Sequence, residues 1–238
     1  MELGVYYGNH PIIIMRKCKV VSKRKPKDFR DVFIERRPFR SLIASAIEVY
    51  NKETNGALLG RHAVRKIEGR KTEVVSVKQV YPFQTEKRSP SKVIHGNKAA
   101  FRRVLRAMES LKTEIIGGYH SHPYPYGFVG LSEGDVTSVK EDIEAMEKIG
   151  QERVKNGWIE LLLSIKRKDY MKPGKREWYI CDYVKKLRVR IRTRKKTGYD
   201  VLVSAYWVYP KENFSEKPIM EMKFGVKEVA VFVPWNLE

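Results

Sequence analysis

The sequence predicts an α/β (α+β) fold, in which a β-sheet is flanked by helices and followed by a β-rich C-terminal segment. Two observations favour this class. Short apolar and β-branched runs recur along the chain and are bounded by Gly, Pro and Asn. Between them lie two segments with apolar residues at helical spacing and a third that starts with a helix cap. With 238 residues, 42% of them hydrophobic, the chain can bury a substantial core.

The first half of the chain is expected to contain a helix, a hairpin, a second helix and a buried strand. Pro38 opens the first helix, whose apolar positions recur from Ser41, and Asn55-Gly56 ends it; the second helix is amphipathic. The two hairpin strands are joined by the turn EGRK. The five expected elements cover residues 41–52, 56–67, 72–83, 97–112 and 113–122.

The second half is expected to start with a helix and to continue mainly as strands. Ser132 is a suitable N-cap because Ser-x-x-Asp places a carboxylate beside the exposed amides of the first turn. A helix over 133–149 should precede strands at 157–168, 175–184, 185–210 (a hairpin) and 225–235. We therefore divide the chain into a basic N-terminal extension (1–38), a central domain (39–184) and a basic, β-rich C-terminal extension (185–238).

The chain is strongly basic. It has 48 Lys and Arg against 28 Asp and Glu, a formal net charge of +20, and the charge is dense over residues 16–40. In residues 187–194, arginines alternate with other residues, so on a strand Arg188, Arg190, Arg192 and Arg194 would share one face. Such a surface would attract an anionic partner, including nucleic acid, but a solvated strand face is the simpler interpretation.

Composition also bears on the compartment. Cys18 and Cys181 lie far apart and cannot form a disulfide framework, which agrees with a reducing environment. The N-terminal residues lack the order of a signal peptide, and no apolar run approaches membrane-spanning length. We expect a soluble, cytoplasmic protein that does not enter a membrane. The sequence does not specify an oligomeric state.

Two of the five histidines lie one residue apart in GGYHSHP. On a strand, the side chains of His120 and His122 leave from the same face and can reach one ion. Asp135, near the start of the next helix, could supply a third, oxygen ligand. Three ligands of this kind leave a fourth tetrahedral position for water, as in catalytic zinc sites, where Zn²⁺ lowers the pKa of that water towards about 7.

The segments KETNGALLG (52–60), GYHSHP and LSEGD together resemble the Glu-x-x-Gly and His-x-His-Pro…Ser-x-x-Asp signatures of the JAMM (MPN+) metalloprotease family. Their order along the chain also matches, and the resemblance covers residues 39–184. It implies the MPN/JAMM fold, a mixed, curved sheet flanked by helices. The departure is the segment YPYGFVGL between Pro123 and Ser132, which is two residues longer than is usual in the family.

The resemblance also implies the chemistry. His120, His122 and Asp135 would bind Zn²⁺, Glu53 would be the general acid/base, and Ser132 would support the oxyanion. Family members with all five residues are isopeptidases that release ubiquitin or ubiquitin-like proteins from lysine side chains. The expected partner is therefore a conjugate of a ubiquitin-like or other small modifier protein, and the composition favours a prokaryotic one.

Three alternatives stay open at the level of sequence. Glu48 competes with Glu53 as the base, and Ser132 could act as a helix cap alone. The central domain could also serve as a scaffold, for nucleic-acid binding through the basic flanks or for protein assembly.

Overall fold

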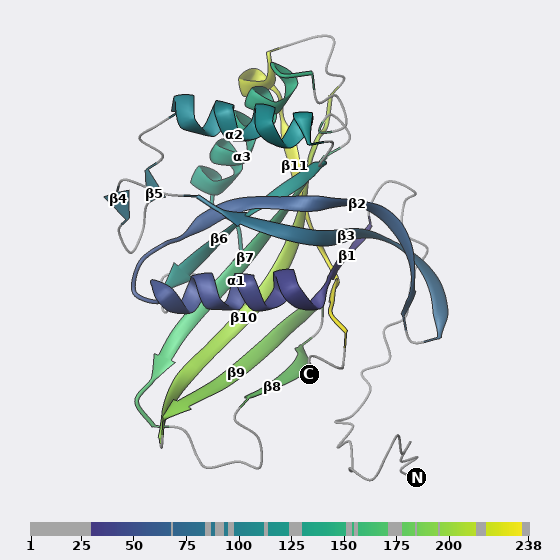
Figure 1. The fold of residues 1–238 in the computed structure, drawn as a ribbon. Coiled ribbons are helices and arrows are strands. Elements are labelled where there is room, and N and C mark those ends of the chain that lie inside the picture. The colour runs from purple at the N-terminus through teal and green to yellow at the C-terminus, as the bar shows by residue number, and fades with distance from the viewer. Residues whose placement is uncertain are drawn as a thin grey trace.

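The computed structural model describes residues 30–234 apart from 68, 84–86, 89–92, 95–97, 112–113, 124–129, 151–153, 155–156, 171–177, 184, 195 and 213–217. Its helices are α1 (Arg36–Glu48), α2 (Lys98–Ser110), α3 (Glu133–Glu147) and the short 3₁₀ helix η2 (Ile219–Glu221). Its strands are β1 (Asp31–Ile34), β2 (Asn55–Ile67), β3 (Arg70–Pro82), β4 (Lys87–Arg88), β5 (Val93–Ile94), β6 (Ile115–Pro123), β7 (Trp158–Lys168), β8 (Trp178–Tyr183), β9 (Lys186–Arg194), β10 (Thr197–Pro210), β11 (Phe224–Val229) and β12 (Val231–Phe232). Figure 1 shows their arrangement.

Ten strands form one mixed, curved sheet, which confirms the predicted fold class. The order is β12-β1-β3-β2-β6-β7-β10-β9-β8, and β11 pairs with β10 beside this path. Pairing is antiparallel except for β1 with β12, β1 with β3, and β6 with β7. Strands β4 and β5 form a separate two-stranded sheet between β3 and α2. The predicted hairpin is confirmed as β2 and β3.

The C-terminal strands connect two distant parts of the sheet. Strand β11 pairs with β10, whereas β12, one residue later, pairs with β1. At the crossover the backbone N–H of Ala230 donates to Asp31 Oδ1 at 2.8 Å, and that of Val32 donates to the Ala230 oxygen at 2.8 Å. The single strand expected over 225–235 is therefore two strands, because the chain changes partner at Ala230.

The strands outside the range 39–184 lie in the same sheet as those inside it. Strand β1 pairs with β3, and β9 and β10 continue the sheet beyond β7. Val32 and Ile34 of β1 are fully buried in the main core. Residues 1–29, most of the predicted N-terminal extension, lie outside the described residues.

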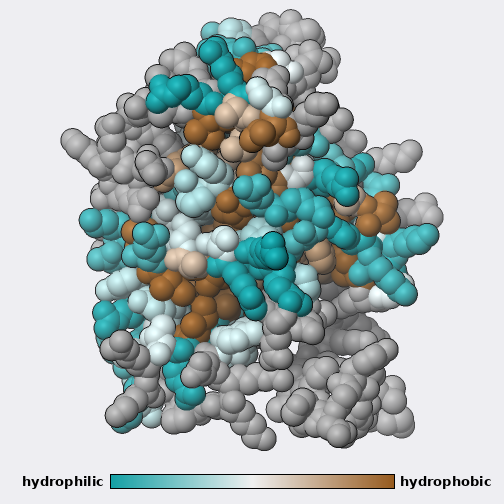
Figure 2. Space-filling model, in the orientation of Figure 1, coloured by the Kyte–Doolittle hydropathy of each residue, from teal (hydrophilic) through white to brown (hydrophobic). Residues whose placement is uncertain are grey.

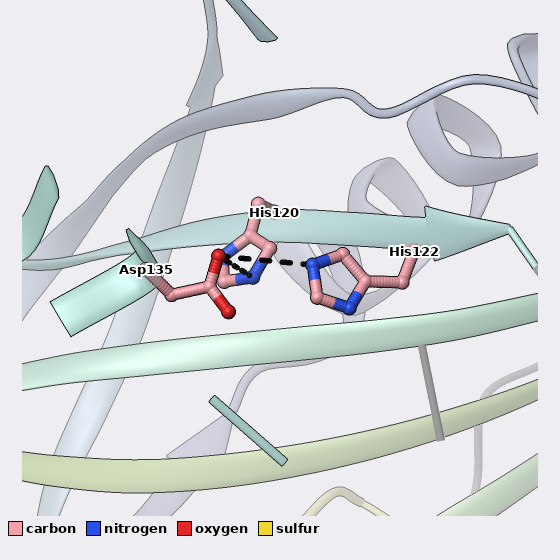
Figure 3. Close-up of side chains that lie close together, drawn as sticks. All are labelled: His120, His122 and Asp135. Carbon is pink, nitrogen blue, oxygen red and sulfur yellow. Dashed lines mark ion pairs between the residues drawn. The ribbon is translucent and has the colours of Figure 1, made fainter. Parts of the chain in front are cut away.

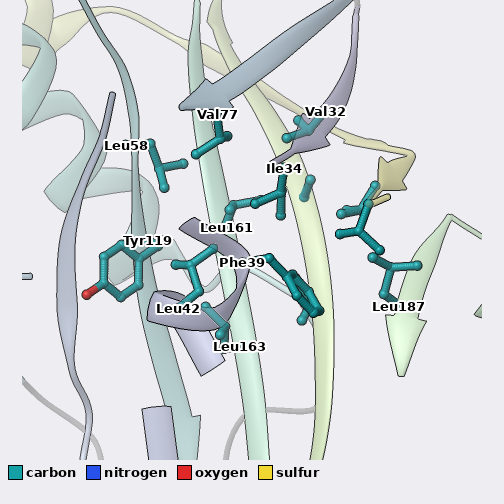
Figure 4. Close-up of a cluster of buried hydrophobic side chains, with 14 of the residues drawn as sticks. Val32, Ile34, Phe39, Leu42, Leu58, Val77, Tyr119, Leu161, Leu163 and Leu187 are labelled. Carbon is teal, nitrogen blue, oxygen red and sulfur yellow. The ribbon is translucent and has the colours of Figure 1, made fainter. Parts of the chain in front are cut away.

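Helix α1 begins two residues before Pro38 and ends four residues earlier than expected. The sequence placed Pro38 at the opening of the helix and the apolar periodicity from Ser41 onwards. Pro38 does lie in the first turn, where the missing N–H removes no helical hydrogen bond. The buried residues of α1 are Pro38, Phe39, Leu42, Ile43 and Ala46. Phe39, Leu42, Ile43 and Ala46 belong to the larger core, part of which Figure 4 shows with the strand side chains around Phe39 and Leu42.

The sheet is covered on both sides, so its central strands are buried on both faces. On one side α1 covers the larger core, which includes Leu161, Leu163 and Ile165 of β7. On the other side α2 and α3 cover a smaller core, which includes Trp158 of β7. Strand β7 therefore reads as an almost continuous apolar run rather than an alternating one.

The molecular surface carries both hydrophilic and apolar side chains. The face that carries α1 shows hydrophilic side chains interspersed with smaller apolar areas (Figure 2). Among the described helices, none is long and apolar enough to cross a membrane. The expected cytoplasmic location stays a prediction.

Candidate metal centre

Strand β6 carries both histidines between its neighbours β2 and β7. His120 pairs in register with Asn55 of β2 and with Leu162 of β7, and His122 pairs with Ser164 of β7. The two rings lie on the same face of the sheet, with centroids 4.7 Å apart. Their side chains are only 13% and 12% exposed. The i, i+2 spacing thus brings the rings together as expected.

Helix α3 brings Asp135 to the histidines through its N-terminal cap. The Ser132 hydroxyl accepts the N–H of Asp135 at 3.1 Å, and the Ser132 N–H donates to Asp135 Oδ2 at 2.7 Å. This capping box leaves the second carboxylate oxygen directed at the rings. Oδ1 lies 3.5 Å from His120 Nε2 and 3.8 Å from His122 Nε2. Dashed lines mark the ion pairs among these residues in Figure 3.

The three groups fit a zinc ion. Their ligand atoms all lie within 4.8 Å of one another. Ligands about 2.0–2.1 Å from a tetrahedral ion are ~3.3 Å apart, close to the two separations from Asp135. His120 Nε2 is buried and has no hydrogen-bond partner among the described residues, although a buried polar nitrogen is normally paired. Two imidazole nitrogens and one carboxylate oxygen are also the donors that catalytic zinc sites use.

Glu53 lies beside this cluster. It immediately precedes Thr54 and β2, and its Oε1 is 3.6 Å from His122 Nε2. Burial raises the pKa of Glu53, although the nearby histidines oppose the shift. Glu48, the competing candidate, is exposed at the end of α1. The geometry therefore favours Glu53 as the carboxylate that can exchange protons at the site.

The serine between the two histidines holds the segment that carries Glu53, and sequence reasoning missed this. Ser121 points to the opposite face of β6, where its hydroxyl accepts the N–H of Thr54 at 3.1 Å. Its own N–H donates to the Thr54 oxygen at 2.8 Å. Both residues are fully buried, so the two hydrogen bonds are shielded from water. The tripeptide His-Ser-His of β6 thus supplies two candidate metal ligands and the serine that holds the Glu53 segment.

Ser132 is exposed, and the contact that the structure shows for its hydroxyl is the helix cap. The hydroxyl oxygen accepts a hydrogen bond there, while its own hydrogen remains available for donation. The oxyanion role stays a prediction. The loop of unusual length between Pro123 and Ser132 falls largely outside the described residues, at 124–129.

A second residue that the sequence did not reveal as part of the site is Glu160 of β7. Its Oε1 lies 2.7 Å from His120 Nδ1, the ring nitrogen that faces away from Asp135. The signal in the sequence was a single carboxylate within the apolar run WIELLL. Because a buried carboxylate needs partners, that residue could have been suspected of pairing with a cation or a donor.

The charges of the metal-free cluster depend on one another. Burial disfavours a charged His120, yet the adjacent carboxylates of Asp135 and Glu160 outweigh it and raise the pKa of His120 to about 10. Burial likewise disfavours ionised Asp135, but the adjacent imidazoles of His120 and His122 lower the pKa of this carboxyl below its usual range. At neutral pH the metal-free site therefore holds an imidazolium beside a carboxylate.

Comparisons with known proteins identify the family. The model of the prokaryotic homologues of the JAB domain matches residues 35–157, more than half of the chain. The chain belongs to this family, which confirms the resemblance to JAMM proteins found in the sequence. The match ends before β7, so Glu160 lies outside it.

A solved structure is also similar, and no curated protein matches. The structure is the solution structure of protein DSY2949 from Desulfitobacterium hafniense, which is 14% identical. The alignment covers 87% of this chain and 95% of that one, with a TM-score of 0.44. A likeness at this level carries no argument about function.

The purified chain should bind one zinc ion, and replacing both histidines should abolish binding. His120→Ala with His122→Ala removes two of three ligands, so metal analysis after dialysis should find no zinc in the variant. His62→Ala, which removes an exposed histidine farther along β2, is the matched control and should keep its zinc. Zinc retained by the double variant would show that the ion is bound elsewhere.

Zinc binding should release a proton from His120. The metal-free ring is protonated at neutral pH because its pKa is raised to about 10, and a metal ligand must be deprotonated. Affinity should therefore rise by ~tenfold per pH unit between about pH 7 and 9. Calorimetric titrations in buffers of different ionisation enthalpy count the released protons. Affinity that is independent of pH would contradict the charge state described above.

Proposed function

We propose that the chain is a zinc-dependent isopeptidase that cleaves the bond after the C-terminal glycine of a ubiquitin-like or other small modifier protein. The observation that carries the proposal is the convergence of three candidate ligand atoms, His120 Nε2, His122 Nε2 and Asp135 Oδ1, with Glu53 beside them. Membership of the JAB family supports metal-dependent hydrolysis.

The chain's own groups divide the work. His120, His122 and Asp135 would hold the ion, which when bound supplies a Lewis acid and makes water more acidic. Glu53, whose pKa is raised by burial, would take a proton from water and deliver it to the departing lysine amine. Ser132 would direct its hydroxyl hydrogen at the developing oxyanion while its oxygen continues to cap α3.

Glu53→Gln should keep zinc and the fold but lose most turnover. The substitution preserves shape and removes the group that carries the proton, so the rate should fall on the order of a hundredfold or more. Glu48→Gln, at an exposed position five residues earlier, is the matched control and should cleave normally. Both are measured on a small modifier protein joined through its C-terminal glycine to a lysine side chain. If Glu53→Gln cleaves at the parent rate, Glu53 is not the general acid/base and another residue carries the proton.

A basic surface continues from the metal centre across the same face of the sheet. His122 pairs with Ser164 of β7, and Lys166 and Lys168 follow on that face because strand side chains alternate. The same face extends onto β10, because Lys166 pairs in register with Asp200 and Lys168 pairs with Gly198. Asp200 and Gly198 in turn pair with Arg190 and Arg192 of β9.

Part of this charge is neutralised within the chain. Asp200 accepts two hydrogen bonds from Arg188, one at 2.8 Å from Nε, and also lies 3.6 Å from Arg190. Arg190 in addition donates to the Tyr179 hydroxyl at 2.6 Å. Because Arg188 and Arg190 have partners within the chain, these contacts favour a structural strand face over an anion-binding site for these two residues. The side chain of Arg194 lies outside the described residues.

The net positive charge of this face favours an acidic protein as the partner. Lys166, Lys168 and Arg192 lie on the same face of the sheet as the metal centre, so their charge would attract an acidic modifier to the face where it is cleaved. Nucleic acid bound without sequence preference is the competing candidate. Binding of either partner would weaken as salt is added. The effect of charge reversal on conjugate cleavage distinguishes the two candidates.

Lys166→Glu, Lys168→Glu and Arg192→Glu together should raise KM for an acidic conjugate at low salt and leave kcat unchanged. The control reverses three charges at the far end of the β2–β3 hairpin, Lys66→Glu, Arg70→Glu and Lys71→Glu, and should keep the parent KM. If nucleic acid is the partner, the first variant will instead lose binding of a single-stranded oligonucleotide, with cleavage unchanged. If the first variant matches the parent chain in both assays, the basic surface binds neither partner and is a solvated strand face.

A further inference from the structure

Glu160 is a buried carboxylate with two hydrogen-bond partners. It lies on β7 and is 6% exposed. Its Oε1 contacts His120 Nδ1 at 2.7 Å, and its Oε2 accepts the indole N–H of Trp158 at 2.9 Å. Trp158 is itself buried in the core beneath α2 and α3. The carboxylate thus connects a candidate metal ligand to a rigid part of the fold.

Both partners require an acceptor. The indole nitrogen of Trp158 can only donate, and a histidine that binds metal through Nε2 carries its hydrogen on Nδ1. An ionised carboxylate accepts with both oxygens and satisfies the two donors at once. A glutamine of the same shape has one accepting oxygen and one donating nitrogen, so one of the two donors would face another donor.

Gly118 on the neighbouring strand leaves room for this arrangement. It pairs in register with Glu160, and a Cβ at this position would lie 2.8 Å from Glu160 Oε2 and 3.3 Å from Trp158 Cζ2. The adjacent Gly117 is different, because a Cβ there would lie 1.9 Å from the backbone oxygen of Ile159. The glycine pair before the histidines therefore serves both the packing of β6 against β7 and the space for Glu160.

We propose that Glu160 is the positioning residue for His120. Its carboxylate keeps the ring hydrogen on Nδ1 and directs Nε2 towards His122 and Asp135, so that the ligand set is formed before the ion binds. Carboxylates that hold a metal-bound histidine in this way raise the basicity of the ring and fix its orientation. The inference rests on the proposed metal site but not on the modifier or on cleavage.

Zinc affinity of Glu160→Gln tests the role. A chelator competition assay on the full chain should find the dissociation constant raised 10–100-fold, the range typical for loss of such a partner. Glu35→Gln is the matched control, since it removes a half-buried carboxylate that pairs with Arg65 and Lys78 away from the site, and it should bind zinc like the parent. A folded Glu160→Gln chain with the parent's dissociation constant would overturn the inference and leave the metal site standing.

A measurement on the parent chain keeps the test independent of how the variant folds. Nitrogen NMR of the zinc-loaded protein should show His120 with its hydrogen on Nδ1 and the ion on Nε2. The opposite assignment would overturn the proposal, because Glu160 would then face a nitrogen without a hydrogen. A parent chain that binds no zinc would instead refute the proposed function itself.

Discussion

The site depends on the register of β6 between β2 and β7. Because strand side chains alternate between faces, a slip of one residue would turn His120 and His122 towards α1 and bring Ser121 to the opposite side. The register is held by parallel pairing with β7 over seven residues, from Gly117 to Pro123. The glycines that begin this stretch allow the close approach, since side chains at 117 and 118 would collide with β7.

Each remaining group reaches the histidines by a local device of its own. Glu53 is held where α1 ends and β2 begins, through the paired hydrogen bonds of Thr54 and Ser121. Asp135 is aimed by the cap of α3, which engages one carboxylate oxygen and leaves the other for the ion. Glu160 arrives from β7 and fixes the far side of His120. The α1–β2 junction, the start of α3 and strand β7 therefore all converge on β6.

Sequence reasoning succeeded where the information was local. The i, i+2 histidines and the Ser-x-x-Asp cap are short patterns whose geometry follows from strand and helix periodicity. It failed where contacts join distant residues: Glu160 lies 40 residues from His120, and Ser121 lies 67 residues from Thr54. The division of the last strand at Ala230 could not be predicted either, because strand partners are chosen by the whole sheet. The start of α1 is nearly local too: Pro38 was taken to open the helix, and the helix begins two residues before it.

The chemistry proposed for this chain requires one zinc ion between β6 and the N-terminus of α3. Crystals of the zinc-loaded chain, measured on both sides of the zinc absorption edge, test it most directly. We expect one anomalous peak within about 2.0–2.2 Å of His120 Nε2, His122 Nε2 and Asp135 Oδ1. A peak that involves other residues, or no peak at these three atoms in zinc-loaded crystals, would contradict it.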